Sequence, residues 1–133
     1  MIPLKSEKDL AMMSRSGQVL AAVMSRLKKL VRPGISTHEI DILAEEFVLR
    51  ENAAPAFKGY KGYTASICTS LNEEIVHGIP GERRLKEGDI ISLDLGVNYQ
   101  GYFSDLAITV AIGEVNPKLK KLIEVTRKAL SEG

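Results

Sequence analysis

IISLDLGVNYQGYFSDLAITVAI, residues 90–112, holds two runs in which branched apolar residues alternate with small or polar ones. A period of two is typical of half-buried strands, and the polar stretch Asn98–Gly101 between the runs predicts a two-residue hairpin turn. Each strand then has one branched face, which packs on an apolar layer. The opposite face is lined by small and polar residues, carries Asp94 and Asp105, and has room for a ligand.

The two aspartates are the first candidate functional residues. If Tyr99 and Gln100 form the loop, Asp94 faces Asp105, with Cβ atoms about 4.5–5.5 Å apart. Two carboxylates at that distance repel and retain a proton unless a cation lies between them. A pair of metal ions would remove the repulsion. On the pattern alone the alternative stays open that both aspartates are hydrated beside a polar turn.

Composition indicates an ordinary globular protein. The chain has 133 residues, 26% charged and 44% hydrophobic, which fits a single domain. A net charge of +1 gives no electrostatic reason to expect nucleic acid or an anionic membrane as partner. The single cysteine, Cys68, fits a reducing compartment. Early acidic residues argue against a signal peptide, and no apolar run is long enough to span a membrane, so we expect a cytoplasmic protein.

Helix signals flank the strand region. Ser6–Asp9 and Ser36–Glu39 have the spacing of capping boxes, and apolar residues then recur at helical spacing to about residues 31 and 52. Asn116, followed by proline, predicts a third helix. A short strand is expected over residues 64–69, with loops over 53–62 and 72–81. This order predicts an α+β fold, an antiparallel sheet covered by helices on one face.

Aspartate oxygens suit Mg, Mn, Fe, Co or Zn in a dinuclear cluster, but such a cluster needs further His or Glu ligands. The chain has only two histidines, His38 and His77. His38 falls in the first turn of a helix, where we expect a surface position. His77 lies in a Gly/Pro-rich loop of the kind that carries binding residues. Its alternative is a loop histidine that bonds to backbone carbonyls.

Three segments together resemble type I methionine aminopeptidases. They are NEEIVHGIP at 72–80, GDIISLD at 88–94 and GYFSD at 101–105, and the resemblance runs from Ser6 to Gly133. It implies a pita-bread fold, in which two pseudo-symmetric halves enclose a dinuclear metal site. It also implies removal of the N-terminal methionine from nascent polypeptides whose second residue is small.

The resemblance also implies roles for individual residues. Asp94 matches the aspartate that chelates one metal ion, and Asp105 matches the aspartate that bridges both, where a complete site holds two divalent ions (Co, Mn, Fe or Zn). His77 matches the histidine that contacts the scissile amide. The positions that line the methionine side-chain pocket are Tyr60, Tyr63, Cys68 and Phe57. Some relatives have cysteine in place of Phe57.

The length departs from the family, whose members are about twice as long and take a histidine and two glutamates from their second half. The resemblance therefore implies that residues 1–133 are the N-terminal half of a catalytic domain and are inactive alone. Expected partners are N-terminal Met peptides, and either the missing C-terminal half or a second copy. One alternative is a non-catalytic pita-bread binding module. A prolidase-type peptidase is disfavoured by the phrase His77–Pro80.

Overall fold

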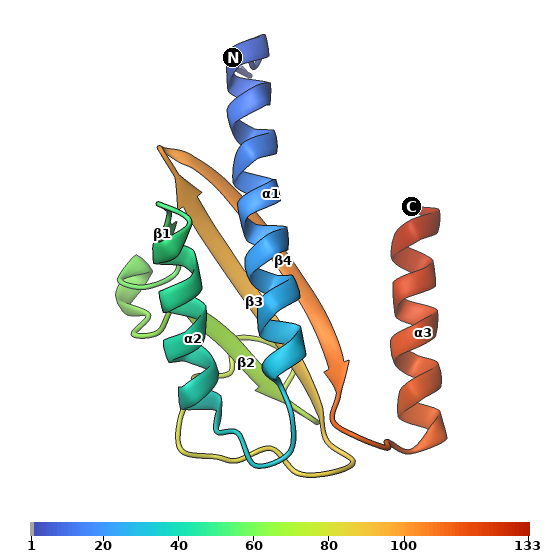
Figure 1. Cartoon of the computed structure of the whole chain (residues 1–133). Coiled ribbons are helices and arrows are strands. Elements are labelled where there is room, and N and C mark those ends of the chain that lie inside the picture. Colours follow the sequence, from blue (N-terminus) through green and yellow to red (C-terminus); the bar gives the residue numbers. More distant parts are fainter. Residues whose placement is uncertain (1) are drawn as a thin grey trace.

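A computed structural model describes residues 2–133 and contains three α-helices, one 3-10 helix and a four-stranded sheet (Figure 1). In chain order the elements are α1 (Glu7–Leu30), α2 (Thr37–Arg50), β1 (Ala54–Pro55), the 3-10 helix η1 (Tyr60–Gly62), β2 (Ile67–Leu71), β3 (Ile90–Tyr99), β4 (Tyr102–Ala111) and α3 (Pro117–Glu132). Along these residues, no helix combines the length and the apolar character needed to cross a bilayer.

Both predicted capping boxes begin helices. In α1 the Asp9 amide donates to the Ser6 hydroxyl over 3.2 Å, and the Ser6 amide donates back to the Asp9 carboxylate over 2.9 Å. In α2 the Glu39 amide and the Ser36 hydroxyl are 3.1 Å apart, with the reciprocal bond at 2.8 Å. Each box satisfies amides that a helix start leaves without partners, so local sequence sets these two boundaries.

β3 is the central strand of an entirely antiparallel sheet. β4 pairs with it over its whole length, while β2 and β1 lie one after the other along its second edge. The expected strand at 64–69 begins later, at Ile67, and runs to Leu71. The two-residue β1 and the helix η1 fall where the sequence indicated only a loop. β1 was not predicted because two residues, one of them proline, show no alternation.

The hairpin register differs from the predicted one. The loop consists of Gln100 and Gly101, with φ of 52° and 89°, and Tyr99 pairs with Tyr102. Positive φ at both central residues is the type I′ geometry that matches strand twist, and glycine favours it at the second position. The expectation that Asp94 faces Asp105 was therefore wrong. Asp94 faces Ala107, and Asp105 faces Gly96.

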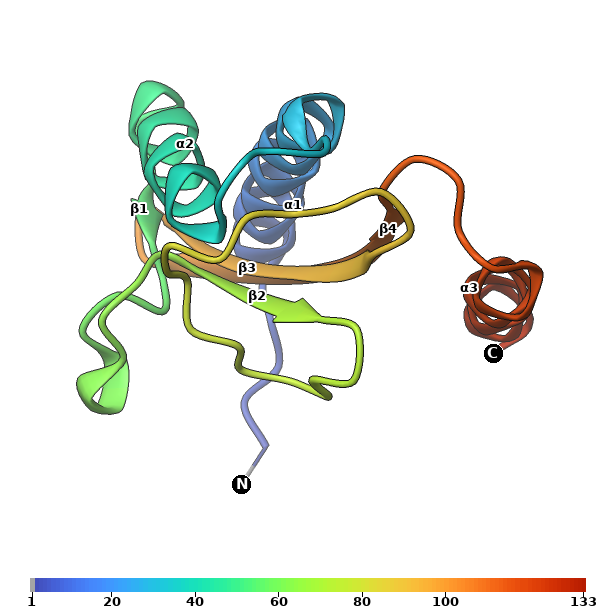
Figure 2. The ribbon, with the colours of Figure 1, turned by 90° about the horizontal axis from the view of Figure 1, so that it is seen from below.

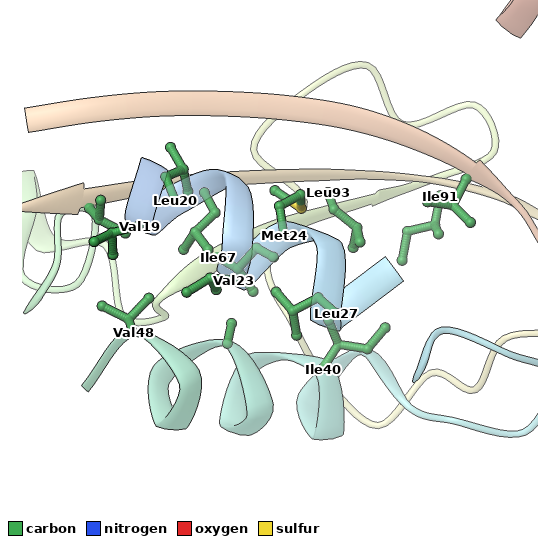
Figure 3. Close-up of a cluster of buried hydrophobic side chains, with 14 of the residues drawn as sticks. Val19, Leu20, Val23, Met24, Leu27, Ile40, Val48, Ile67, Ile91 and Leu93 are labelled. Atoms are coloured by element: carbon green, nitrogen blue, oxygen red, sulfur yellow. The ribbon is translucent and has the colours of Figure 1, made fainter. Parts of the chain in front are cut away.

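Helices α1 and α2 cover one face of the sheet, as predicted (Figure 2). The branched side chains of β3 point to them and are fully buried, and α1 and α2 contribute the facing apolar stripes. Figure 3 shows this layer, which includes Val19, Leu20, Val23, Met24, Leu27, Ile40, Val48, Ile67, Ile91 and Leu93. Because these side chains fix the helix face, the aspartates must lie on the other face of β3 and β4.

Helix α3 begins as expected, with the Asn116 side chain accepting from the Lys118 amide over 2.9 Å. It stands beside β4, apart from the helices that cover the sheet (Figures 1 and 2). None of its residues is buried, and Leu122 and Leu130 are 57% and 81% exposed. The amphipathic helix predicted from the sequence therefore forms, but its apolar stripe is open.

Candidate functional site

The site lies on the sheet face opposite α1 and α2. Asp94 sits at the centre of β3 with Cys68 of β2 beside it and Ala107 of β4 on its other side. Asp105 is two register positions nearer the hairpin turn, on the same face. The segments before and after β2 run on this side of the sheet (Figure 2). A small neighbour on each strand leaves space around the Asp94 carboxylate.

The Asp94 carboxyl is in an unfavourable electrostatic position. Burial raises its pKa, the negative charge of Asp105 raises it further, and the charge of His77 acts in the opposite direction. Its Oδ1 atom is buried and has no hydrogen-bond partner among the described residues. A buried carboxylate oxygen without a partner costs stability. Such an atom beside a second carboxylate is therefore explained by a function rather than by folding.

The loop that carries His77 runs beside β2, the strand that pairs with β3 at Asp94. His77 is exposed and has φ of 58°, the left-handed region that a side chain with a Cβ rarely adopts. Its loop is joined to β2, because the Thr69 amide donates to the Gly78 carbonyl over 2.8 Å. The predicted functional histidine thus extends from a loop held against the strand next to Asp94. His38, by contrast, is exposed at the start of α2, as expected.

Three of the four predicted pocket residues lie close to the strand positions of the aspartates: Cys68 and Phe57 contact them or their strand partner, and the Tyr63 hydroxyl donates to the carbonyl of Ile67, the residue before Cys68. Cys68 pairs directly with Asp94. Burial raises the pKa of its thiol, a hydrogen bond with Tyr63 opposes this, and the two aspartate charges raise the pKa further, which disfavours a thiolate nucleophile. Burial likewise raises the pKa of Tyr63. Phe57 packs on Gly96, the partner of Asp105: a Cβ on residue 96 would lie 2.6 Å from the ring atom Cε1.

Tyr60, the fourth predicted pocket residue, is not brought to the aspartates in this structure. It is 64% exposed, and its ring centroid is 5.4 Å from the amine of Lys61. η1 carries both residues and includes a backbone break at Lys61, where φ is 47°. The role implied for Tyr60 therefore stays a prediction.

Asp41, a residue of α2, supports the site and was not found from the sequence. Its Oδ1 accepts from the Ser66 amide over 2.7 Å and from the Ile67 amide over 3.2 Å. It thereby fixes the start of β2, one residue before Cys68. No sequence signal identifies this contact, because an aspartate on the polar side of a helix is ordinary and its partners are 25 positions away.

The donor set fits one side of a metal site. Asp94 and Asp105 supply hard oxygen ligands, and the unpartnered Oδ1 of Asp94 has the chemistry a divalent cation requires. Within residues 2–133, however, no group of three or more His, Cys, Asp or Glu side chains is arranged to hold a metal ion. The two carboxylates could therefore provide only part of a metal-ligand set.

Comparison with known proteins identifies relatives along the whole chain. Residues 11–133 match metallopeptidase family M24. Methionine aminopeptidase 1 of Bacillus subtilis is 48% identical over 133 residues, which are 100% of this chain and 54% of that protein. The chain therefore spans about half the length of this curated relative.

Solved structures agree with the sequence comparison. The crystal structure of methionine aminopeptidase from Rickettsia prowazekii superposes with a TM-score of 0.96 at 37% identity, over 98% of this chain and 53% of that one. The Thermotoga maritima methionine aminopeptidase gives 0.95 at 38% identity, over 99% and 53%. The half pita-bread architecture expected from the sequence is confirmed.

Proposed function

Because this chain belongs to metallopeptidase family M24, we propose that its sheet face forms one wall of the dinuclear metal site of a methionine aminopeptidase. The observation that carries the proposal is the buried, unpartnered Oδ1 of Asp94 beside the second carboxylate, Asp105. In this assignment Asp94 binds one metal ion and Asp105 bridges two. Co, Mn, Fe and Zn all accept such oxygen ligands, so the donors alone do not select one of them.

The proposed reaction is hydrolytic removal of an N-terminal methionine from nascent polypeptides whose second residue is small. The B. subtilis, R. prowazekii and T. maritima proteins are all named methionine aminopeptidases, which supports this substrate class. Metal ions held by Asp94 and Asp105 would supply an activated water molecule and would polarise the substrate carbonyl. The proposed cellular location is the cytoplasm, where nascent chains are made.

The other residues of this face act on the substrate in the proposal. His77 donates a hydrogen bond to the scissile amide and stabilises the oxyanion that forms there. Phe57, Tyr63 and Cys68, together with Tyr60, line the pocket for the methionine side chain. Aromatic rings and an uncharged thiol suit a thioether, since sulfur makes favourable contacts with ring edges. The protonated state of Cys68 is consistent with this role.

We expect the 133-residue chain alone to bind metal weakly and to lack activity. Two carboxylates without further His or Glu ligands are a poor site for a transition metal. The unoccupied edge of β4 and the open stripe of α3 are the surfaces through which the remaining ligands would be brought close. In the absence of another partner, the same surfaces support self-association of this chain as a symmetric dimer.

A second candidate is a non-catalytic binding module with the same fold. The absence of a three-donor cluster within the described part of the chain favours it. The presence of both aspartates argues against this candidate. A buried carboxylate oxygen without a partner lowers stability, and a module that binds no metal would gain nothing in return. The two candidates differ in their response to divalent metal ions.

The test is a calorimetric titration of the chain with Mn²⁺ and with Co²⁺. The proposal predicts weak binding, measured at high metal concentration, that Asp94→Asn and Asp105→Asn each abolish. Glu46→Gln is the matched control, because it removes a carboxylate that lies in a surface pair with Arg50 on α2. Binding that survives both aspartate substitutions, or is lost equally in Glu46→Gln, would count against the proposal.

A further inference from the structure

The backbone conformation of His77 depends on contacts made by neighbouring residues and not on a hydrogen bond of its own imidazole. His77 is exposed, and no side-chain hydrogen bond of its imidazole is found among residues 2–133. A left-handed conformation is unfavourable for a residue other than glycine. Something must therefore hold the backbone at φ of 58°.

The next residue, Gly78, is fixed at both of its backbone polar groups. Its amide donates to the Ser70 hydroxyl over 3.1 Å. Its carbonyl accepts from the Thr69 amide over 2.8 Å and from the Tyr63 hydroxyl over 3.3 Å. The approach is so close that a Cβ at position 78 would lie 2.3 Å from the Thr69 carbonyl oxygen, which is why glycine is required there.

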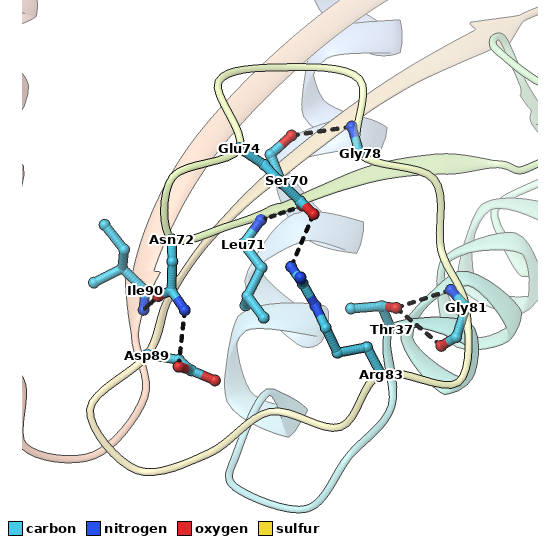
Figure 4. A network of polar contacts seen from close by, with 10 residues as sticks. All are labelled: Thr37, Ser70, Leu71, Asn72, Glu74, Gly78, Gly81, Arg83, Asp89 and Ile90. Carbon is cyan, nitrogen blue, oxygen red and sulfur yellow. Dashed lines mark hydrogen bonds and ion pairs between the residues drawn. The ribbon is translucent and has the colours of Figure 1, made fainter.

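The ends of the same loop are held by separate contacts, shown in Figure 4. At its start, Asn72 accepts from the Ile90 amide over 3.0 Å. At its end, Thr37 and Gly81 exchange two hydrogen bonds, each of 2.9 Å. Removal of the Ser70 hydroxyl would therefore leave the loop attached at both ends and affect its middle.

We propose that Ser70 and Tyr63 are positioning residues that, through Gly78, hold the His77 backbone in its left-handed conformation on the loop beside β2, the strand next to Asp94. Ser70 is buried on the aspartate face, two residues from Cys68, and the hydroxyl is its only polar side-chain group. The claim that Ser70 affects catalysis rests on the proposed function. The claim that Ser70 holds the loop at Gly78 concerns the folded chain alone and does not depend on that function.

The test is amide hydrogen exchange by NMR on the metal-free chain. In Ser70→Ala we expect the Gly78 amide to exchange about five- to tenfold faster, the effect of losing one hydrogen bond. The buried Leu93 amide reports global opening and should stay unchanged. Ser70→Thr, which retains a hydroxyl, should restore the protection. Ser92→Ala is the control, because it removes a different hydroxyl bond of the same face, 2.9 Å to Thr109.

Tyr63→Phe provides a second, independent variant. It retains the ring and removes the hydroxyl that donates to the Gly78 and Ile67 carbonyls. We expect the His77 and Gly78 amide signals to move in this variant and in Ser70→Ala, while those of β4 stay in place. Gly78 exchange within twofold of the parent in Ser70→Ala, or a rise equal to that of Leu93, would overturn the inference.

The catalytic meaning is tested with the C-terminal portion of the B. subtilis relative added to the chain. If that mixture cleaves a Met-Ala-Ser peptide, Ser70→Ala should lower kcat about tenfold and leave KM within twofold. An unchanged kcat would show that Ser70 does not position His77 for the reaction. A mixture that forms a folded complex but is inactive, together with a positive exchange result, would overturn the proposed function and leave the conformational role of Ser70 intact.

Discussion

Asp94 and Asp105 lie diagonally across the β3–β4 ladder, on the same face and two register positions apart, because Asp94 pairs with Ala107 and Asp105 with Gly96. Each aspartate therefore has a small residue directly opposite it, and the two carboxyl groups still interact, since the negative charge of Asp105 raises the pKa of Asp94. The diagonal arrangement thus keeps both carboxyl groups on one face of the sheet without opposing them directly.

The metal-free chain should gain stability when the Asp94 charge is removed. Burial and Asp105 raise the pKa of Asp94, so the folded state retains a proton that the unfolded state has lost. Its contribution to the free energy of unfolding consequently falls as pH rises from about 4 through that raised pKa. Asp94→Asn should raise Tm at pH 7 and have less effect at pH 4. A lower Tm at pH 7 would show that the carboxylate is structural.

Acid should weaken the contact between α1 and the hairpin. The Ser6 cap and the Tyr102 hydroxyl, 2.7 Å from Asp9, hold the pKa of Asp9 at about 2. Because this pKa is below the unfolded value of 3.8, the stabilisation is present above pH 4 and is lost as pH falls toward 2. Asp9→Asn should flatten the dependence of Tm on pH between 5 and 2. An unchanged slope in Asp9→Asn would contradict this account.

A methyl group at position 96 should disturb the packing of Phe57 on β3. The added Cβ would lie 2.6 Å from Phe57 Cε1 and 3.1 Å from Ala56 Cβ, so the ring must move. We expect Gly96→Ala to lower the free energy of unfolding by about 1–3 kcal/mol, measured by urea denaturation. Gly17→Ala is the control, since a methyl group at position 17 would meet nothing within 4 Å, and we expect it to stabilise α1. Equal effects at both positions would refute the packing argument.

Loss of Asp41 should loosen the start of β2. Asp41→Ala leaves the Ser66 and Ile67 amides without their acceptor in a buried segment, at a cost of about 1–3 kcal/mol. Glu46→Ala, which removes only a surface pair with Arg50 on the same helix, should change the free energy of unfolding by less than about 1 kcal/mol. Urea denaturation of the two variants compares them directly. Similar losses in both would mean that the Asp41 contacts contribute little.

The features of the fold that depend on residues close together in the sequence were predictable. Both capping boxes are contained within four residues, and the alternation in β3 and β4 decides which face of each strand is buried. Alternation alone does not decide the register of β3 against β4. Moving the turn by one residue shifts the partner strand by two positions, so every side chain stays on the same face of the sheet. What decides it is the pair of positive φ values at Gln100 and Gly101.

The residues of the candidate site also fall into a group that the sequence predicts and a group that it does not. Asp94, Asp105 and His77 stand out as chemically distinctive residues in a strand pair and a Gly/Pro-rich loop. Ser70 and Asp41 do not, because their contacts with Gly78 and with the Ser66 amide join segments that only the folded chain brings together. Supporting residues of this kind are ordinary polar residues until the tertiary structure assigns them partners.

The most direct test of the central claim is peptide hydrolysis by a reconstituted pair. The chain is mixed with the C-terminal portion of the B. subtilis relative in the presence of Mn²⁺ or Co²⁺, and methionine release from a Met-Ala-Ser peptide is measured. We predict release by the mixture, none by either part alone, and none when the chain carries Asp105→Asn. A mixture that forms a folded complex but releases no methionine, or undiminished release with Asp105→Asn, would contradict the account.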